Sequence, residues 1–346
     1  MRLLKYLIVL IVLVAIVAGA AVYFGAGRVY EPYKGYDTPE VLIEVPNGAG
    51  PATIGRRLVA AGVVRDEMTF RGAVWMSGRA RDLKAGEYQF DQPMTPMEVI
   101  DKLARGDVYR RRITFREGLT IPEMAAVYEQ SGFGDAAEFT TAASDVSLIK
   151  DLDPDARDLE GYLFPETYSL PRETPASVLI AQMVALFQKA FTPEVREGIK
   201  AQGLTPREAV TVASLVEKET AVAEERAVVA AVYLNRKRIG MPMQADPTVI
   251  YALQRAGRYD GNIRRADLQF DSPYNTYRYP GLPPGPIASP GRAALEAVAN
   301  PADSDYLYFV SRNDGSHVFA RTYEEHNRNV REWQIEYFRR QRQQQR

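Results

Sequence analysis

The sequence contains no cysteine and only two histidines, His317 and His326. The absence of cysteine excludes disulfides, thiolate zinc sites, iron–sulfur clusters and a cysteine nucleophile. Two histidines cannot supply a three-histidine zinc site, so a zinc amidase is a poor candidate, and we expect neither a metal nor a cofactor. The two histidines do not stand at the spacing of helical metal ligands, and we predict structural roles for them.

The sequence also lacks an excess of charge of either sign. Lys and Arg number 43 against 44 Asp and Glu, which gives a formal net charge of -1. No global basic field would attract nucleic acid, and we expect no nucleic-acid partner. With 46% hydrophobic and 25% charged residues, the composition is that of a folded globular protein. The 346 residues suffice for a sizeable core and for more than one domain.

The N-terminus carries a long apolar segment. Residues 6–27 contain no charged side chain, and Arg2 and Lys5 precede them. About 20 apolar residues span a bilayer, so we predict a cytoplasmic N-terminus at 1–5 and a transmembrane helix at 6–27. A cleaved signal peptide is the alternative, but its apolar region is usually only about 7–15 residues long. The positive-inside rule places the remainder of the chain outside the cytoplasm.

A linker at 28–40 is predicted to lead into a small α/β module. Its N-terminal half contains a predicted strand and a helix between Gly48 and Gly62, and a similar strand and helix flank Gly118 and Gly132 at the same glycine spacing. We interpret this as a weakly duplicated β-loop-α unit, with chance similarity as the alternative. The predicted elements are strands at 41–45, 87–90 and 113–115 and helices at 53–61 and 121–130 in a module spanning 41–147.

The remainder, 148–346, is predicted to be helix-rich, and the fold class is α+β. Thr95, Thr120 and Thr205 each stand three residues before a Glu, with a Pro between the two. This pattern is typical of a capping box at the start of a helix. We predict helices at 175–191, 206–220 and 224–238, a loop-rich stretch at 240–290 that we expect to be functional, a strand at 306–311 and a terminal helix near 324–340.

The most informative segment is the end of the helix predicted at 206–220. Val212, Leu215, Val216 and Glu219 fall on one face at helical spacing. A carboxylate on an apolar stripe is desolvated, which raises its pKa and suits a general acid at neutral pH. Glu217 faces the other way. A core ion pair of Glu219 with Arg226 or Arg236 is an equally good interpretation of this pattern alone.

Further polar residues stand in turn-forming segments beside aromatic residues. The segment 160–168 joins carboxylates to aromatic rings, a combination that lines many sugar sites, although a Pro-containing turn with a buried aromatic core is the simpler interpretation. Amides, hydroxyls and tyrosines on Pro- and Gly-rich loops suit recognition of hydroxyl and acetamido groups, but could equally be turn chemistry. The candidate substrate-binding residues are Glu166, Tyr168, Glu217, Gln244, Asp246, Asn275, Thr276 and Tyr277.

Five separated motifs resemble those of a known protein family. The segments VASLVEKETA, LEGYLFPETY, YLNRKRIGMPMQADPTVIYAL, SPYNTY and GLPPGPIASPG, together with the N-terminal apolar run, are similar to the YceG-like family of endolytic murein transglycosylases. The resemblance implies a single-pass protein of the bacterial inner membrane with a LysM-like module, at 41–147, and a catalytic domain, at 148–346. Peptidoglycan glycan strands are the implied substrate, and cell-wall synthases such as penicillin-binding proteins are the implied partners.

The resemblance also implies the reaction and its principal residue. The MurNAc–GlcNAc bond within nascent strands would be cleaved with formation of a 1,6-anhydro-MurNAc end, which would terminate strand elongation. The second Glu of EKET, here Glu219, is the implied acid and base, in agreement with the helical-face argument. The family's usual Asp in the turn that contains Glu166 is replaced by this Glu.

Two other functions stay open at this point. A muramidase-type hydrolase would need a second carboxylate near the anomeric carbon, for which Glu166 and Asp246 are candidates. A non-catalytic, membrane-tethered peptidoglycan-binding scaffold would need no acid at all. The intact EKET and YNTY segments favour an enzyme over this scaffold.

Overall fold

The computed structural model describes residues 12–13, 27–172 and 174–344. The predicted transmembrane helix at 6–27 lies almost wholly outside this part of the chain. Within the described residues, no helix is both long and apolar enough to cross a membrane. The described residues divide into two compact units, unit 1 up to residue 112 together with 169–172, and unit 2 from 113 to 168 together with 174–344.

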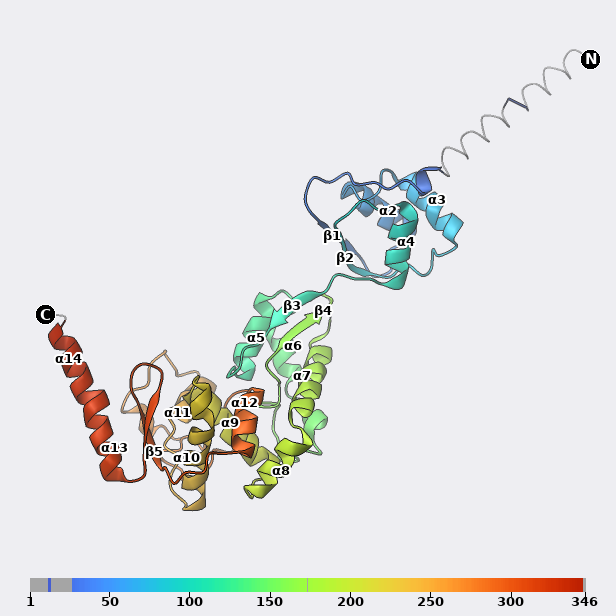
Figure 1. Ribbon diagram of the computed structural model, residues 1–346. Coiled ribbons are helices and arrows are strands. Elements are labelled where there is room, and N and C mark those ends of the chain that lie inside the picture. Colours follow the sequence, from blue (N-terminus) through green and yellow to red (C-terminus); the bar gives the residue numbers. More distant parts are fainter. Residues whose placement is uncertain (1–11, 14–26, 173, 345–346) are drawn as a thin grey trace, which may run out of the picture. The chain divides into compact units, whose positions relative to one another are not determined.

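Unit 1 is built from a two-stranded antiparallel sheet and three helices (Figure 1). The sheet and the helices contribute side chains to one common core. In β1, Ile43 and Val45 point into the core, while Leu42 and Glu44 alternate outward. The predicted strands at 41–45 and 87–90 are confirmed as an antiparallel pair with two helices between them in the chain, and the helix expected at 53–61 begins two residues earlier. The elements are β1 (Val41–Val45), α2 (Pro51–Ala60), α3 (Glu67–Ser77), β2 (Gly86–Phe90) and α4 (Pro96–Arg105).

Unit 2 contains the helix-rich remainder. Helices α9, α10 and α12 pack against one another, α8 contacts α9 and α12, and α11 contacts α9 (Figure 1). The elements that begin in or near this unit are β3 (Arg111–Thr114), α5 (Ile121–Gln130), α6 (Ala136–Ala142), η1 (Val146–Ile149), β4 (Thr167–Leu170), α7 (Ala176–Ala190), α8 (Pro193–Ala201), α9 (Pro206–Glu219), η2 (Ala223–Glu225), α10 (Arg226–Arg238), α11 (Asp246–Arg255), η3 (Asp267–Gln269), α12 (Arg292–Ala299), β5 (Tyr308–Ser311), β6 (His317–Ala320), α13 (Tyr323–Val330), η4 (Arg331–Glu336) and α14 (Tyr337–Gln344).

The division between units falls earlier than the predicted boundary after residue 147. Residues 113–147, which include α5 and α6, belong to unit 2. The backbone N–H of Phe115 donates to the carbonyl of Glu166, which ties these two parts of the chain together. Helices α5 and α6 then pack on each other and α6 on α7. Packing of these helices, which local sequence patterns do not report, therefore joins residues 113–147 to unit 2.

The expected duplication is visible in the local backbone. Gly48 and Gly62 flank α2 with φ values of 73° and 71°, and Gly118 and Gly132 flank α5 with 76° and 72°. These are left-handed conformations that glycine adopts without strain. In both copies a second helix follows, capped by an Asp side chain. The two segments thus share a strand–helix–helix plan.

The loop-rich stretch predicted at 240–290 contains a helix that we did not expect. Helix α11 starts at Asp246, and Pro247 occupies its first turn. We interpreted Asp246-Pro247-Thr248 as a turn, but proline at the start of a helix loses no intrahelical hydrogen bond and has a suitable φ. The predicted terminal helix is divided into α13, η4 and α14, with η4 a π-helical segment.

A buried ion pair joins three segments of unit 2. The side chain of Asp153 is only 3% exposed, and Arg207 Nη1 donates to its two carboxylate oxygens at 3.0 and 2.9 Å. The hydroxyl of Tyr162 donates to the same carboxylate at 2.7 Å. Arg207 Nε in addition donates to the carbonyl of Pro284 at 2.8 Å. The first turn of α9 is therefore fixed to the 153–162 segment and to the proline-rich loop.

Candidate active site

Helix α9 presents its last residue, Glu219, at the end of a buried helix. The helix begins with a complete capping box in which Thr205 and Glu208 satisfy each other's backbone N–H groups. Val212, Leu215 and Val216 are fully buried, as the helical spacing predicts. Helix α9 ends at Glu219 because Thr220 adopts an extended conformation. The carboxyl group therefore lies where the buried stripe of α9 stops.

Tyr233 of α10 holds the Glu219 carboxyl group. Its hydroxyl donates to Glu219 Oε1 at 2.7 Å, and its side chain is 1% exposed. Burial raises the pKa of Glu219, and the negative charge of Asp246 raises it further. The Tyr233 hydrogen bond and the positive charges of His317 and Arg236 oppose that rise without cancelling it. The pKa of Glu219 is thus shifted in the direction that a general acid requires.

Asp246 and Tyr277 form a second hydrogen-bonded pair next to this carboxyl group. The hydroxyl of Tyr277 donates to Asp246 Oδ1 at 2.6 Å. Burial raises the pKa of Tyr277, and the charges of Asp246 and Glu219 add to this rise. Asp246, the first residue of α11, and Tyr277, from the SPYNTY segment, therefore share an electrostatic environment with Glu219.

The ion pair that we considered between Glu219 and an arginine is not formed among the described residues. Arg236 instead donates to the carbonyl oxygens of Leu307 and Met243, at 2.6 Å each. Its guanidinium is buried and affects Glu219 only through its charge. The geometry therefore favours the general-acid interpretation of the apolar stripe.

Glu225 holds the chain just beyond α9. Its carboxylate accepts the backbone N–H of His317 and contacts the His317 Nδ1 atom, each at 2.7 Å. The Thr220 hydroxyl also donates to it, at 3.2 Å. His317 thus has the structural role that we predicted, while its ring lies close enough for its charge to affect Glu219.

Two other candidates, Asn275 and Thr276, are buried and form hydrogen bonds within the fold. Asn275 is fully buried, and its amide donates to the carbonyls of Leu268 and Phe270 at 3.0 and 2.8 Å. Thr276 is also buried, with its hydroxyl 2.9 Å from that of Thr248. Both side chains thus form hydrogen bonds within the fold.

The residues of the PETY segment also contribute to the fold. Tyr168 is buried and donates its hydroxyl to the carbonyl of Phe164 at 2.7 Å, so it belongs to the core. Glu166 is exposed and accepts the N–H of Thr167 at 2.8 Å, at the start of β4. The simpler interpretation of this segment, a turn with a buried aromatic residue, is the one that fits.

Glu217 and Gln244 organise backbone near the site. Glu217 Oε2 accepts the N–H of Gly291 at 2.9 Å, and burial raises the pKa of this carboxyl group. Gln244 has a φ of 47°, and its N–H donates to the carbonyl of Thr276 at 3.4 Å. Glu217 thus fixes the loop before α12, and Gln244 has one of the two left-handed conformations found among described non-glycine residues.

Sequence reasoning did not single out Tyr233. It lies on α10 among buried residues at helical spacing, including Val229, Val232 and Arg236. A tyrosine on such a buried face needs a hydrogen-bond partner for its hydroxyl, and this requirement was the available signal. The sequence could not identify that partner as the last residue of the preceding helix.

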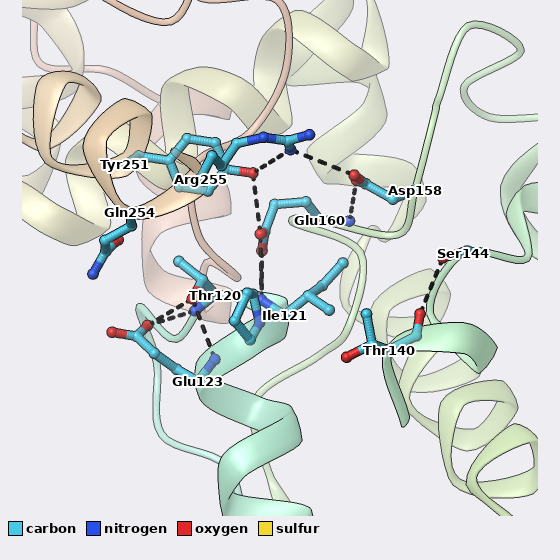
Figure 2. A pocket seen from close by; sticks show the side chains of 11 residues that line it. Thr120, Ile121, Glu123, Thr140, Ser144, Asp158, Glu160, Tyr251, Gln254 and Arg255 are labelled. Atoms are coloured by element: carbon cyan, nitrogen blue, oxygen red, sulfur yellow. Dashed lines mark hydrogen bonds and ion pairs between the residues drawn. The ribbon is translucent and has the colours of Figure 1, made fainter. Parts of the chain in front are cut away.

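A separate cavity of about 400 Å³ lies at the start of α5 and is called the α5 pocket below. Figure 2 shows Glu160 at its inner wall between the N-terminus of α5 and Tyr251 of α11. Glu160 accepts the N–H of Ile121 at 3.2 Å and the hydroxyl of Tyr251 at 3.2 Å. Burial raises the pKa of Glu160 to about 8. None of our sequence predictions included this cavity.

Comparisons with known proteins agree with one another. The model of the YceG-like family matches residues 43–332. A protein of Bacillus subtilis (strain 168) named endolytic murein transglycosylase is 32% identical over 330 residues, covering 90% of each chain. A protein of the same name from Streptococcus pneumoniae serotype 2 is 34% identical over 346 residues, covering 90% of this chain and 62% of that one. A crystal structure of a yceG-like protein from Listeria monocytogenes matches with 30% identity and a TM-score of 0.57, covering 84% of this chain and 98% of that one.

Proposed function

This chain belongs to the YceG-like family, and we propose that it is an endolytic murein transglycosylase in which Glu219 is the acid and base. The bond cleaved is the β-1,4 link between MurNAc and GlcNAc inside a glycan strand. The observation that carries the assignment is the Glu219 carboxyl group, which combines a raised pKa with a fixed position against Tyr233.

The proposed reaction needs one carboxyl group because no water enters the product. Protonated Glu219 donates its proton to the glycosidic oxygen, and the bond from C1 to that oxygen breaks. The C6 hydroxyl oxygen of the same MurNAc forms the new bond to C1, and the Glu219 carboxylate accepts the proton that this hydroxyl loses. The nucleophile belongs to the substrate, and such intramolecular attack has effective molarities of up to about 10⁵–10⁸ M.

The hydrogen bond from Tyr233 is proposed to fix which oxygen of Glu219 transfers the proton. Tyr233 occupies Oε1, so Oε2 is the oxygen available for the glycosidic bond. Asp246 and Tyr277 are proposed to stabilise the positive charge that develops at C1, since Asp246 is the carboxylate whose charge acts on Glu219. Tyr277 would hold Asp246 in position for this role.

A hydrolase with two carboxylates is the second candidate, and Asp246 is the observation that favours it. Its charge already acts on Glu219, as a nucleophile or base beside the acid of a hydrolase would. Glu166 is a weaker candidate for this role because its carboxylate is engaged by the N–H of Thr167. The two reactions differ by one water in the product, so product mass distinguishes them.

The placement of the enzyme is also part of the proposal. The uncharged run at 6–27, preceded by Arg2 and Lys5, supports a single membrane anchor with residues 28–346 outside the inner membrane. The strand–helix–helix–strand order of unit 1 suits a LysM-like module that contacts peptidoglycan. Cell-wall synthases are the proposed partners, and termination of nascent strands is the proposed outcome.

Mass spectrometry of the products tests the proposed function. We expect the full-length chain, incubated with uncrosslinked glycan strands, to release internal fragments that are one water lighter than hydrolysis products. Fragments that carry the full water would instead establish a hydrolase and direct attention to Asp246. A well-folded chain that binds strands without any cleavage would support the non-catalytic scaffold.

Substitutions of Tyr233 and Asp246 are expected to shift the pH profile in opposite directions. Tyr233→Phe removes a hydrogen bond that lowers the pKa of Glu219, whereas Asp246→Asn removes a charge that raises it. A general acid must be protonated, so the alkaline decline of kcat/KM should move to higher pH in the first variant and to lower pH in the second. Profiles that move together would contradict the assignment of Glu219 as the titrating acid.

A further inference from the structure

We propose that the α5 pocket is a second saccharide-binding site, distinct from the reaction centre at Glu219, and that it holds a distal part of the glycan strand. The inference rests on the proposed function for the identity of the strand. The chemistry of the pocket follows from its lining residues and is independent of the proposed function.

The α5 pocket has the size and the rigidity of a ligand site. Its volume of about 400 Å³ lies within the range of small-molecule sites, roughly 300–1,000 Å³. The walls come from the first turn of α5, the end of α6, the segment around residues 158–160 and the last turn of α11 (Figure 2). Regular elements or hydrogen-bonded turns thus form every wall, so binding would order little of the chain.

The polar groups of the inner wall form hydrogen bonds with one another. Glu160 is bonded to Ile121 and Tyr251, and Arg255 Nη1 donates to the Tyr251 hydroxyl at 3.1 Å. Asp158 accepts the N–H of Glu160 at 3.1 Å and lies 3.6 Å from Arg255. This network fixes the shape of the pocket without a ligand. The N-terminus of α5 already interacts with a carboxyl group of the protein, that of Glu160, through the N–H of Ile121.

The rim offers donors and acceptors that the protein leaves unused. Among the described residues, the side-chain amide of Gln254 forms no hydrogen bond, and it is exposed at the pocket. Glu123 uses one carboxylate oxygen in the capping box of α5 and leaves the other free. The hydroxyl of Thr140 donates to the carbonyl of Ala136, so its oxygen can still accept a hydrogen bond. Pro122 adds an exposed apolar surface.

The charges of the pocket favour a neutral ligand. An anion would face the carboxylates of Glu123 and Asp158, and the one arginine of the lining, Arg255, is already paired with Asp158. A cation would face Arg255 and the N-terminus of α5. A ligand rich in hydroxyl and acetamido groups can instead use Gln254 and Thr140 together and place a C–H face on Pro122. This chemistry is that of a neutral saccharide such as an N-acetylhexosamine chain.

Helix α11 relates the pocket to the reaction centre. Asp246 begins this helix beside Glu219, and Tyr251, Gln254 and Arg255 line the pocket from its last turns. The helix has 10 residues, so its ends lie about 15 Å apart at the α-helical rise. A linear glycan with several rings on one side of the cleaved bond is long enough to cover this distance. The pocket would therefore favour long strands over short ones.

Amide hydrogen exchange on the full-length chain carrying Glu219→Gln tests the proposal, with a tetramer of N-acetylglucosamine as the probe. We expect the tetramer to slow exchange at residues 140–144 and 251–255. Gln254→Ala should raise the half-saturating concentration for this protection by roughly three- to tenfold, the effect of one lost hydrogen bond. Thr140→Trp should fill the pocket and abolish the protection, with the melting temperature as the control for folding.

Gln182→Ala is the matched control, because Gln182 is an exposed glutamine on α7 outside the pocket lining. Protection near Glu219 alone, or equal protection in Gln254→Ala and Gln182→Ala, would overturn the proposal. Cleavage of strands by the wild-type chain is measured separately. Protection at the pocket without cleavage would support the pocket proposal and contradict the proposed function. Cleavage without protection at the pocket would contradict the pocket proposal alone.

Discussion

Glu219→Gln is expected to abolish most of the strand-cleaving activity while leaving the protein folded. Glutamine has nearly the same shape as a protonated glutamate and can still accept the Tyr233 hydrogen bond, but it has no proton to donate. General acid–base catalysis contributes roughly 10²–10⁴-fold to rate, and kcat should fall by about this factor. Product release from uncrosslinked strands gives the rate, and circular dichroism reports the fold.

The sign of the stability effect separates a catalytic acid from a structural ion pair. The pKa of Glu219 is raised in the folded protein, so at neutral pH the unfolded chain binds fewer protons there than the folded one. Replacing this group by a neutral amide should therefore leave the melting temperature unchanged or raise it. If Glu219 formed a buried ion pair, the same change would lower the stability by about 3–5 kcal/mol.

Glu217→Gln is the control for this experiment, since it makes the same substitution two residues earlier on α9. The Glu217 carboxylate accepts a backbone N–H from Gly291, a hydrogen bond that a glutamine oxygen can also accept. We expect a far smaller loss of rate than for Glu219→Gln. Equal losses in the two variants would mean that the end of α9, and not one carboxyl group, is what the activity requires.

Asp153→Ala is expected to cause the largest loss of stability. The substitution leaves the Arg207 guanidinium and the Tyr162 hydroxyl without their buried acceptor. Removing one partner of a buried ion pair costs about 3–5 kcal/mol, which for a unit of this size lowers the melting temperature by roughly 6–20 °C. Calorimetry or thermal circular dichroism measures the shift.

Asp155→Ala provides the comparison, because Asp155 is an exposed aspartate close by whose backbone N–H, and not its side chain, contacts Asp153. Its melting temperature should remain close to that of the wild type. A small effect of Asp153→Ala would show that the anchoring of α9 to the 153–162 segment does not depend on this carboxylate. Activity should fall together with stability, since α9 carries Glu219.

The candidate acid could be predicted from sequence because its signal is local. Val212, Leu215, Val216 and Glu219 are separated by helical spacing, and one helix fixes their common face whatever surrounds it. The partners of Glu219 were harder to predict because they come from other elements. Tyr233 is fourteen residues away on the next helix, and the Asp246–Tyr277 hydrogen bond spans a separation of 31 residues.

Several candidate binding residues form hydrogen bonds within the protein, and the sequence could not reveal these bonds. Asn275, Thr276 and Tyr168 have side chains that could contact a sugar, and the sequence gives no measure of whether their groups are already used. In compact loops, buried backbone groups need hydrogen-bond partners, and Asn275 supplies two such bonds at once. The grouping of residues 113–147 with unit 2 was not predicted for a related reason, since it depends on the packing of α6 against α7.

The order of elements along the chain has a consequence for synthesis at the ribosome. The core of unit 1 lies entirely between Val29 and Val108, so this unit can fold as soon as that stretch has emerged. Strand β3 emerges next and has no partner until β4 is made. An unpaired strand edge invites association with other chains, and basic side chains discourage it. Arg110, Arg111 and Arg112, at the start of β3, would protect the nascent chain from aggregation during this interval.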